Sequence, residues 1–183
     1  MNAEEVKPKR FYYILHPRPV VVIITRCANG KINAMSASWI TPVSEDHPTI
    51  AVAIDRTSFT HECLEYSGEA TINIPSFIHA DLVYKIGTSS GREIDKIERF
   101  RITLIGSKKI STPRWSEAVG WLEVKVDRYI DIGEVRLYVF NVVESYMRKD
   151  VAGEWGWDTR KASILHHGVG RAFYTVGRVL LAG

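Results

Sequence analysis

The sequence predicts a mainly β protein with short helices, whose strands form a closed or nearly closed barrel. Runs with strand-like patterns recur along the chain and are separated mostly by short turns. Only two short segments have helical spacing, and each follows a capping residue and ends at a glycine. A barrel suits such a chain because closure leaves no exposed strand edge. The predicted strands are residues 20–24, 30–44, 49–55, 69–74, 99–110, 118–127 and 136–144.

Length and composition fit one globular domain over residues 1–183, with 45% hydrophobic and 25% charged residues. The net charge of +3 is scattered, and no basic stripe is interleaved with aromatic residues, which argues against a nucleic-acid-binding barrel. The N-terminal segment does not resemble a signal peptide, and no apolar run reaches the roughly 18 residues of a membrane span. We therefore expect a cytoplasmic protein without nucleic-acid or membrane partners.

The two cysteines, Cys27 and Cys63, stand alone in the sequence. Neither belongs to a CxxC motif or to another zinc-binding spacing. The sequence therefore predicts neither a disulfide framework nor a structural metal, and a reducing compartment agrees with that interpretation.

The first two predicted strands form a hairpin around Asn29-Gly30, a pair that is common in tight turns. The second strand carries small or polar side chains, then Trp39, and then Pro42, which is expected to stop ladder pairing. Small side chains let a planar molecule approach the backbone, whose polar groups can hydrogen-bond a heteroaromatic ring. The alternative is an ordinary edge strand with a polar outer face. The small or polar residues are Asn33, Ala34, Ser36, Ala37 and Ser38.

A candidate phosphate site follows the third predicted strand. Arg56 precedes Thr57, Ser58 and Thr60, and any of these hydroxyl residues can cap a short helix. Free N–H groups, hydroxyls and a guanidinium at a helix start favour a bound anion. The alternative is a plain N-cap beside a surface arginine.

A second helix and a cationic loop come next. Ser76 can cap a helix over residues 77–87, and the Gly/Ser loop after it leads to Arg92 and Lys96. Such a loop can close over an anionic ligand or a reduced cofactor, although exposed lysines are common in loops.

The C-terminal segment contains histidines but no recognised catalytic arrangement. His166 and His167 are adjacent, so they point to opposite sides of a strand, which favours packing or hydrogen bonding over metal ligation. Gly168 and Gly170 do not complete a GxGxxG motif, and P-loop, HExxH and GxSxG patterns are absent. The sequence therefore supports no metal site and no acyl-transfer site.

In combination, these segments resemble the flavin reductase-like, FMN-binding split-barrel family, and most closely its flavoredoxin branch. The resemblance rests on four stretches in a fixed order: INAMSASWITPVS, IAVAIDRTSFTHECLEYSGEATINIP, SGREIDK and HHGVGRAFY. It implies a six-stranded antiparallel split barrel with short helices, which works as a homodimer and holds one FMN in each subunit.

The resemblance also implies which residues contact the flavin. The backbone from Ala34 to Ser38 is expected to run along the isoalloxazine ring, and Lys96 to stabilise negative charge on the reduced flavin. Arg56 and the hydroxyl residues that follow it, Thr57, Ser58 and Thr60, would surround the phosphate. The implied cofactor-binding residues are Asn33, Ala34, Ser36, Ala37, Ser38, Trp39, Arg56, Thr57, Ser58, Thr60, Lys96 and Phe173.

The implied function is that of an oxidoreductase that transfers electrons between NADH or NADPH, or a redox protein, and flavin. The flavin N5 atom carries the chemistry, so no catalytic side chain is expected. Reductases of this family often have a histidine where the alignment places Val135, and this departure removes a donor that could position the nicotinamide. Two alternatives are an FMN that is released as a diffusible product and a protein that only stores FMN.

Overall fold

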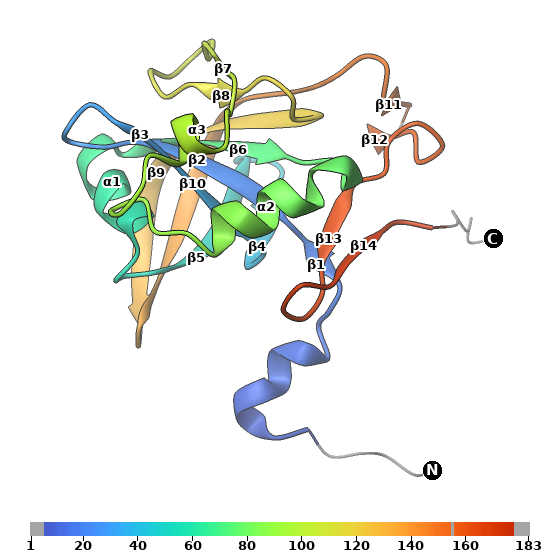
Figure 1. Cartoon of the computed structure of the whole chain (residues 1–183), viewed down its shortest axis with the longest axis horizontal. Helices are drawn as coiled ribbons and strands as arrows, with labels where there is room; N and C mark the ends of the chain where they lie inside the picture. The colour runs from blue at the N-terminus through green and yellow to red at the C-terminus, as the bar shows by residue number, and fades with distance from the viewer. Residues whose placement is uncertain (1–5, 155, 178–183) are drawn as a thin grey trace.

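The computed structural model describes residues 6–154 and 156–177, and its main element is a seven-stranded antiparallel sheet (Figure 1). The strand order is β3-β2-β6-β9-β10-β5-β4. The strands are β2 (Val21–Arg26), β3 (Ile32–Ala37), β4 (Ile40–Ser44), β5 (Thr49–Asp55), β6 (Glu69–Ile74), β9 (Gly120–Ile132) and β10 (Val135–Met147).

The two edges of this sheet are joined by a very short stretch of chain. Only Ser38 and Trp39 separate the edge strand β3 from the opposite edge strand β4. Two residues bridge at most about 10 Å, so the sheet must curl until its edges approach. Within the described residues β3 and β4 do not pair with each other. The result is the expected split barrel, with seven strands in its main sheet rather than six.

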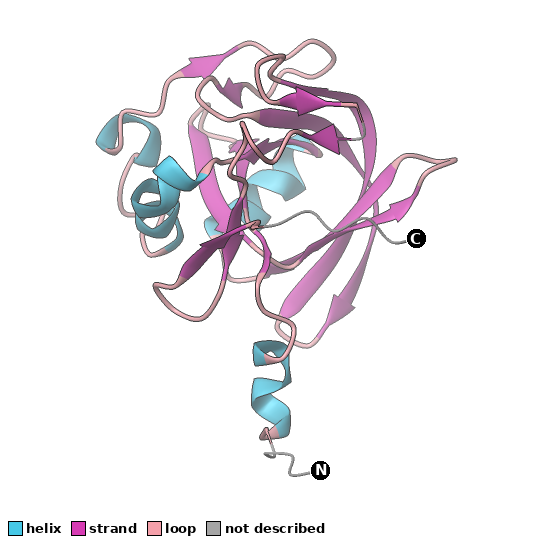
Figure 2. Cartoon of the chain, turned by 90° about the vertical axis from the view of Figure 1, so that its right-hand side faces the viewer, coloured by secondary structure: helices cyan, strands magenta, loops and turns pink. Residues whose placement is uncertain are grey.

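Short helices and three small sheets surround the barrel (Figure 2). The helices are η1 (Pro8–Tyr13), α1 (Phe59–Ser67), η2 (Phe77–His79), α2 (Ala80–Gly87) and α3 (Lys96–Arg99). One small sheet contains β1 (Arg18–Pro19), β13 (Leu165–His167) and β14 (Phe173–Thr175). A second pairs β7 (Leu104–Ile105) with β8 (Arg114–Trp115), and a third pairs β11 (Ala152–Gly153) with β12 (Gly156–Trp157).

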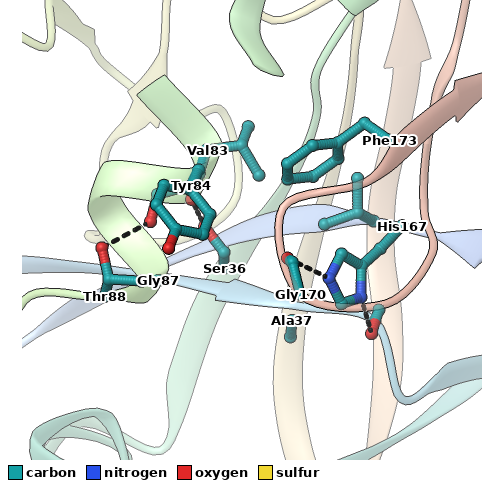
Figure 3. A pocket seen from close by; sticks show the side chains of 11 residues that line it. Ser36, Ala37, Val83, Tyr84, Gly87, Thr88, His167, Gly170 and Phe173 are labelled. Atoms are coloured by element: carbon teal, nitrogen blue, oxygen red, sulfur yellow. Dashed lines mark hydrogen bonds between the residues drawn. The ribbon is translucent and has the colours of Figure 1, made fainter. Parts of the chain in front are cut away.

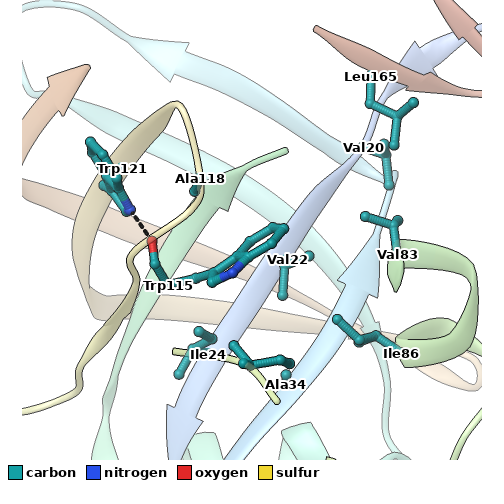
Figure 4. Close-up of a cluster of buried hydrophobic side chains, with 11 residues drawn as sticks. Val20, Val22, Ile24, Ala34, Val83, Ile86, Trp115, Ala118, Trp121 and Leu165 are labelled. Atoms are coloured by element: carbon teal, nitrogen blue, oxygen red, sulfur yellow. Dashed lines mark hydrogen bonds between the residues drawn. The ribbon is translucent and has the colours of Figure 1, made fainter. Parts of the chain in front are cut away.

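Strand β2 is buried on both faces, which explains its uninterrupted apolar sequence. Val21 and Ile23 point into one core cluster, while Val22 and Ile24 point into the other. The second cluster includes Trp115, whose carbonyl accepts a hydrogen bond of 2.7 Å from the indole of a second tryptophan (Figure 4). The central strand is therefore fixed from both sides, and it holds β3 beside it.

The predicted strand over residues 99–110 is wrong, because only Leu104 and Ile105 form a strand there. Arg99 is the last residue of helix α3, and residues 106–110 form a loop that pairs with no neighbouring strand. The buried carboxylate of Glu123 accepts the backbone N–H groups of Lys108 and Lys109, at 2.7 and 2.6 Å. These bonds satisfy the backbone donors that a strand would have paired with a neighbour.

The predicted role of Pro42 is also wrong. Residues 30–44 form two strands, and Pro42 lies inside the second of them, where it pairs with Ile50. Because β4 is an edge strand, a missing N–H group can be tolerated there, and the register shifts between Pro42 and Ser44.

A disulfide joins Cys27 to Cys63, contrary to the sequence prediction. The cysteines are 36 residues apart, and only the packing of α1 against β2 brings them together. Disulfides are rare where thiols are kept reduced, so this bond removes the sequence argument for a reducing compartment. In the part of the chain that the structure describes, the helices are all too short or too polar to cross a membrane.

Candidate functional site

Two adjoining cavities lie along β3. The Phe173 cavity has a volume of about 200 Å³, and the Arg92 cavity about 350 Å³. They meet at Gly87 and Thr88, which line both. A long ligand could therefore extend from one into the other. The Phe173 cavity is lined by Val20, Ser36, Ala37, Ser38, Val83, Tyr84, Gly87, Thr88, His167, Gly170 and Phe173.

The Phe173 cavity is a slot between α2 and the C-terminal loop that carries His167 and Gly170, and Figure 3 shows the residues that line it. Ser36 and Ala37 of β3 form its floor, and Phe173 faces α2 across the opening. Ser36 Oγ donates a hydrogen bond of 2.6 Å to the carbonyl of Val83, which fixes α2 against the floor. A Cβ at Gly87 would lie 3.4 Å from Ser36 Cβ, so glycine keeps this corner open. The slot therefore has several apolar walls and a floor of small side chains, which suits a ring that packs against the backbone.

The start of helix α1 forms one wall of the Arg92 cavity. Of the three cap residues that the sequence allows, Ser58 is the N-cap, and its Oγ accepts from the backbone N–H of His61 at 3.1 Å. Thr57 donates to Asp55 through both its N–H and its hydroxyl, each at 2.7 Å. These bonds hold the pKa of the Asp55 carboxyl below its usual value. The wall therefore combines hydroxyl groups with the positive end of a short helix.

Arg92 supplies the guanidinium of this cavity. Its Nη1 donates to the carbonyl of Thr57 at 2.8 Å, and its Nη2 pairs with Glu62 at 3.1 Å. Both side chains of that ion pair are about half exposed, so the pair is weak and can be exchanged for another anion. The sequence had placed Arg92 in the cationic loop without assigning it to the phosphate.

Asn33 lies at the base of the Arg92 cavity and is buried. Its Nδ2 donates to Thr60 Oγ1 at 2.8 Å, while its Oδ1 is buried without a hydrogen-bond partner among the described residues. A buried carbonyl oxygen without a donor is costly, so a donor from a bound ligand would stabilise it. This unsatisfied atom is the clearest sign that the cavity is built for a polar ligand.

Lys96 is a buried cation at the edge of the same cavity. It begins helix α3, so it is not an exposed loop lysine, and only 5% of its surface is accessible. Its Nζ donates to the carbonyls of Ala34 and Ile86 at 2.9 and 2.8 Å. Burial lowers the pKa of Lys96 to about 8. Within the described residues no carboxylate pairs with it.

We expect Lys96→Met to remove a pH dependence of stability. The unfolded lysine has a pKa of about 10.4, so between this value and the folded pKa the unfolded chain binds a proton that the folded chain lacks. The free energy of unfolding of the wild type should therefore rise as the pH increases from about 8 to 10. Urea unfolding of the flavin-free protein across this window measures the rise. The rise should be absent in Lys96→Met. It should be retained in the control Lys85→Met, which alters an exposed lysine of α2. If the free energy of unfolding changed equally with pH in all three proteins, the lowered pKa would not belong to Lys96.

The structure divides the sequence-predicted site residues into groups. Trp39 is 43% exposed and lines neither cavity, and Arg56 also lies outside both linings. Ala34 is a fully buried residue of β3 that lines neither cavity, and its carbonyl accepts from Lys96. The Arg92 cavity brings together Asn33, Thr57, Ser58, Thr60 and Lys96, and the Phe173 cavity brings together Ser36, Ala37, Ser38 and Phe173.

The adjacent histidines make hydrogen bonds, as the sequence predicts. His166 Nδ1 lies 3.2 Å from the carbonyl of Ile164, and His167 Nε2 lies 3.2 Å from that of Gly170. His167 lines the Phe173 cavity, a position that the sequence did not predict. Across the described ranges, no three His, Cys, Asp or Glu side chains are arranged to hold a metal ion.

Comparison with known proteins agrees with this geometry. Residues 13–168 match the flavin reductase-like domain family. A protein of Archaeoglobus fulgidus, described only as uncharacterised, is 29% identical over 175 residues, which is 96% of each chain.

Solved structures share the fold at lower sequence identity. Flavoredoxin from Methanosarcina acetivorans superimposes with a TM-score of 0.87 at 22% identity, over 98% of this chain and 95% of that one. An FMN-binding protein from Thermus thermophilus with bound 1-cyclohex-2-enone gives a TM-score of 0.84 at 22% identity, over 100% and 98% of the two chains. These likenesses support the assignment of a split-barrel fold.

Proposed function

The chain belongs to the family of flavin reductase-like domains, a family of flavin-binding oxidoreductases, and we propose that it uses FMN to transfer electrons between NAD(P)H or a redox protein and flavin. The observation that carries the proposal is the pair of adjoining cavities on β3. One is a slot lined by small and apolar residues, and the other is a polar pocket with a guanidinium and an unsatisfied buried oxygen. FMN has a matching division into a planar ring and a phosphorylated chain.

The residues present fit FMN. Ser58 and Arg92 offer hydroxyl and guanidinium donors for the phosphate, and Asn33 Oδ1 offers an acceptor. The small side chains of Ser36 and Ala37 would lie along the ring. When bound, FMN supplies hydride transfer at its N5 atom, so the chain needs no nucleophile of its own. The protein's part is to orient the cofactor and to set the charge around it.

Lys96 would contribute charge to this site. Its ammonium group is buried and has no carboxylate partner among the described residues, so it is screened little by solvent. A cation of this kind favours negative charge on a neighbouring ligand. We therefore infer that Lys96 raises the reduction potential of bound flavin.

We expect Arg92→Ala to weaken FMN binding by about tenfold or more, since a hydrogen bond to a charged group contributes roughly 1.5–3 kcal/mol. Arg56→Ala removes the same charge from outside the cavity linings and should leave the affinity nearly unchanged. Fluorescence titration with FMN measures both dissociation constants. A large loss of FMN affinity in Arg56→Ala, with no loss in Arg92→Ala, would contradict this assignment. It would show that the phosphate binds at Arg56, the arginine that the sequence indicated.

Anaerobic mixing of the FMN-loaded protein with NADH and NADPH tests the proposed function. Bleaching of the oxidised flavin band is the expected result. If NADH, NADPH and a reduced redox protein all failed to bleach the flavin band, the alternative of a protein that only stores FMN would be favoured. Equilibrium dialysis separates a resident FMN from a diffusible one, because a diffusible flavin has a dissociation constant well above the protein concentration.

The homodimer remains a proposal, and exposed apolar side chains support it. Phe11, on the helix η1 that projects from the barrel in Figure 2, is 55% exposed, and Ile14, which follows this helix, is 70% exposed. Val43 on the edge strand β4 is 56% exposed. Burial of such side chains against a second copy of the chain would remove them from water. Sedimentation measurements should give twice the mass of one chain.

A further inference from the structure

A third cavity adjoins the Phe173 cavity on the side away from Arg92. This Arg18 cavity has a volume of about 370 Å³. It shares Ser38, His167 and Gly170 with the Phe173 cavity, so the two open onto each other. Its walls are mainly aromatic: it is lined by Tyr12, Tyr13, His16, Arg18, Ser38, Trp39, His167, Gly168, Val169 and Gly170.

Arg18 is a cation without a carboxylate partner. None of the carboxylates that the structure describes forms an ion pair with it. Its guanidinium lies 5.5 Å from the ring centre of Trp39 and 5.9 Å from that of Tyr12. Its Nε is buried and has no hydrogen-bond partner in the described part of the chain. Burial lowers the pKa of Arg18, as expected for a desolvated charge.

His16 provides a second unsatisfied donor. Arg18 Nη2 lies 2.9 Å from His16 Nε2, and because a guanidinium can only donate, Nε2 must accept. The neutral imidazole therefore carries its proton on Nδ1, which is also buried without a partner in residues 6–154 and 156–177. Burial, followed by the charge of Arg18, lowers the pKa of His16 and keeps the ring neutral. Two residues of one cavity thus each hold a buried N–H group that lacks an acceptor.

We propose that the Arg18 cavity is the subsite for the second substrate, and that it binds a small planar organic acid through Arg18 and His16. A carboxylate has two acceptor oxygens and can satisfy two donors at once, while a planar ring suits the aromatic walls. Arg18 is then a specificity-determining residue. This proposal rests on the proposed function in one respect, namely that the neighbouring Phe173 cavity holds the flavin. The residues of the subsite itself all come from this chain.

Benzoate and its neutral analogue benzamide test the subsite in both the flavin-free and the FMN-loaded protein. Saturation-transfer NMR measures the affinity of each ligand without any enzymatic turnover. The wild type should bind benzoate about tenfold or more tightly than benzamide, because only benzoate brings a negative charge to the guanidinium of Arg18. Arg18→Gln should lose this preference, Arg18→Lys should keep part of it, and Lys9→Gln, which removes an exposed charge of η1, should keep all of it.

Equal binding of benzoate and benzamide by the wild type, or an undiminished preference in Arg18→Gln, would overturn the proposal. Retained FMN binding by Arg18→Gln shows that the variant is folded. If Arg18→Gln weakens self-association and leaves the ligand preference intact, the missing acceptor belongs to a second copy of the chain, which also overturns the proposal. These outcomes differ from failure of the proposed function, which appears as absent FMN binding in the wild type.

Discussion

Replacement of Gly91 by alanine is expected to lower FMN affinity by about a hundredfold or more. A Cβ at this position would lie 2.1 Å from Asn33 Oδ1 and 2.8 Å from Phe59 Cδ1. Both are well inside contact distance, so either the loop or Asn33 must move. The base of the Arg92 cavity is then deformed, and overpacking of this kind commonly costs about 1–3 kcal/mol of stability as well. Fluorescence titration and urea unfolding measure the two effects.

Gly106→Ala is the matched control, because its new Cβ would meet no atom within 4 Å. It should bind FMN like the wild type. If Gly91→Ala also bound FMN normally, the Arg92 cavity would not be the cofactor site.

Removal of the disulfide is expected to have the largest effect on stability. The bond closes a sequence separation of 36 residues, for which the chain-entropy relation gives about 3–4 kcal/mol. The Cys27→Ala, Cys63→Ala double variant should therefore unfold at a clearly lower urea concentration. The effect should extend to the site, since the bond joins the turn before β3 to the helix α1, and these elements carry Asn33 and Thr60.

Addition of a reductant to the wild type should reproduce the loss of stability and leave the double variant unchanged. Thiol titration of the unfolded, unreduced wild type should find no free thiol. Two free thiols, together with an unfolding midpoint equal to that of the double variant, would show that Cys27 and Cys63 do not form a disulfide.

The sequence was sufficient to predict the features that depend on local patterns. The apolar run in β2 predicted a strand, Gly68 was predicted correctly as the end of α1, and Ser58 was one of the three residues predicted as its cap. Each signal arises from side chains within a few residues of one another. The strand pattern predicted a closed or nearly closed barrel, and the resemblance to a family then specified a split barrel.

Features that depend on distant contacts were missed. The partner of Cys27 is 36 residues away, so its spacing gave no signal. The loop after Ile105 departs from a strand because the buried Glu123 binds its backbone, and the buried state of a carboxylate cannot be read from alternation alone. Similarly, Arg56 is nearer than Arg92 to the helix start in sequence, but the folded loop brings Arg92 to the cavity.

In the proposed complex, the polar Arg92 cavity binds the phosphate of FMN, and the adjoining Phe173 cavity binds the attached ring. Parallel titrations of the purified, flavin-free protein with FMN and with riboflavin test it directly, because the two ligands differ only in the phosphate. We predict that FMN binds about a hundredfold more tightly, as two charge-assisted hydrogen bonds would provide. Equal affinities for the two flavins, or no binding of either, would contradict the account.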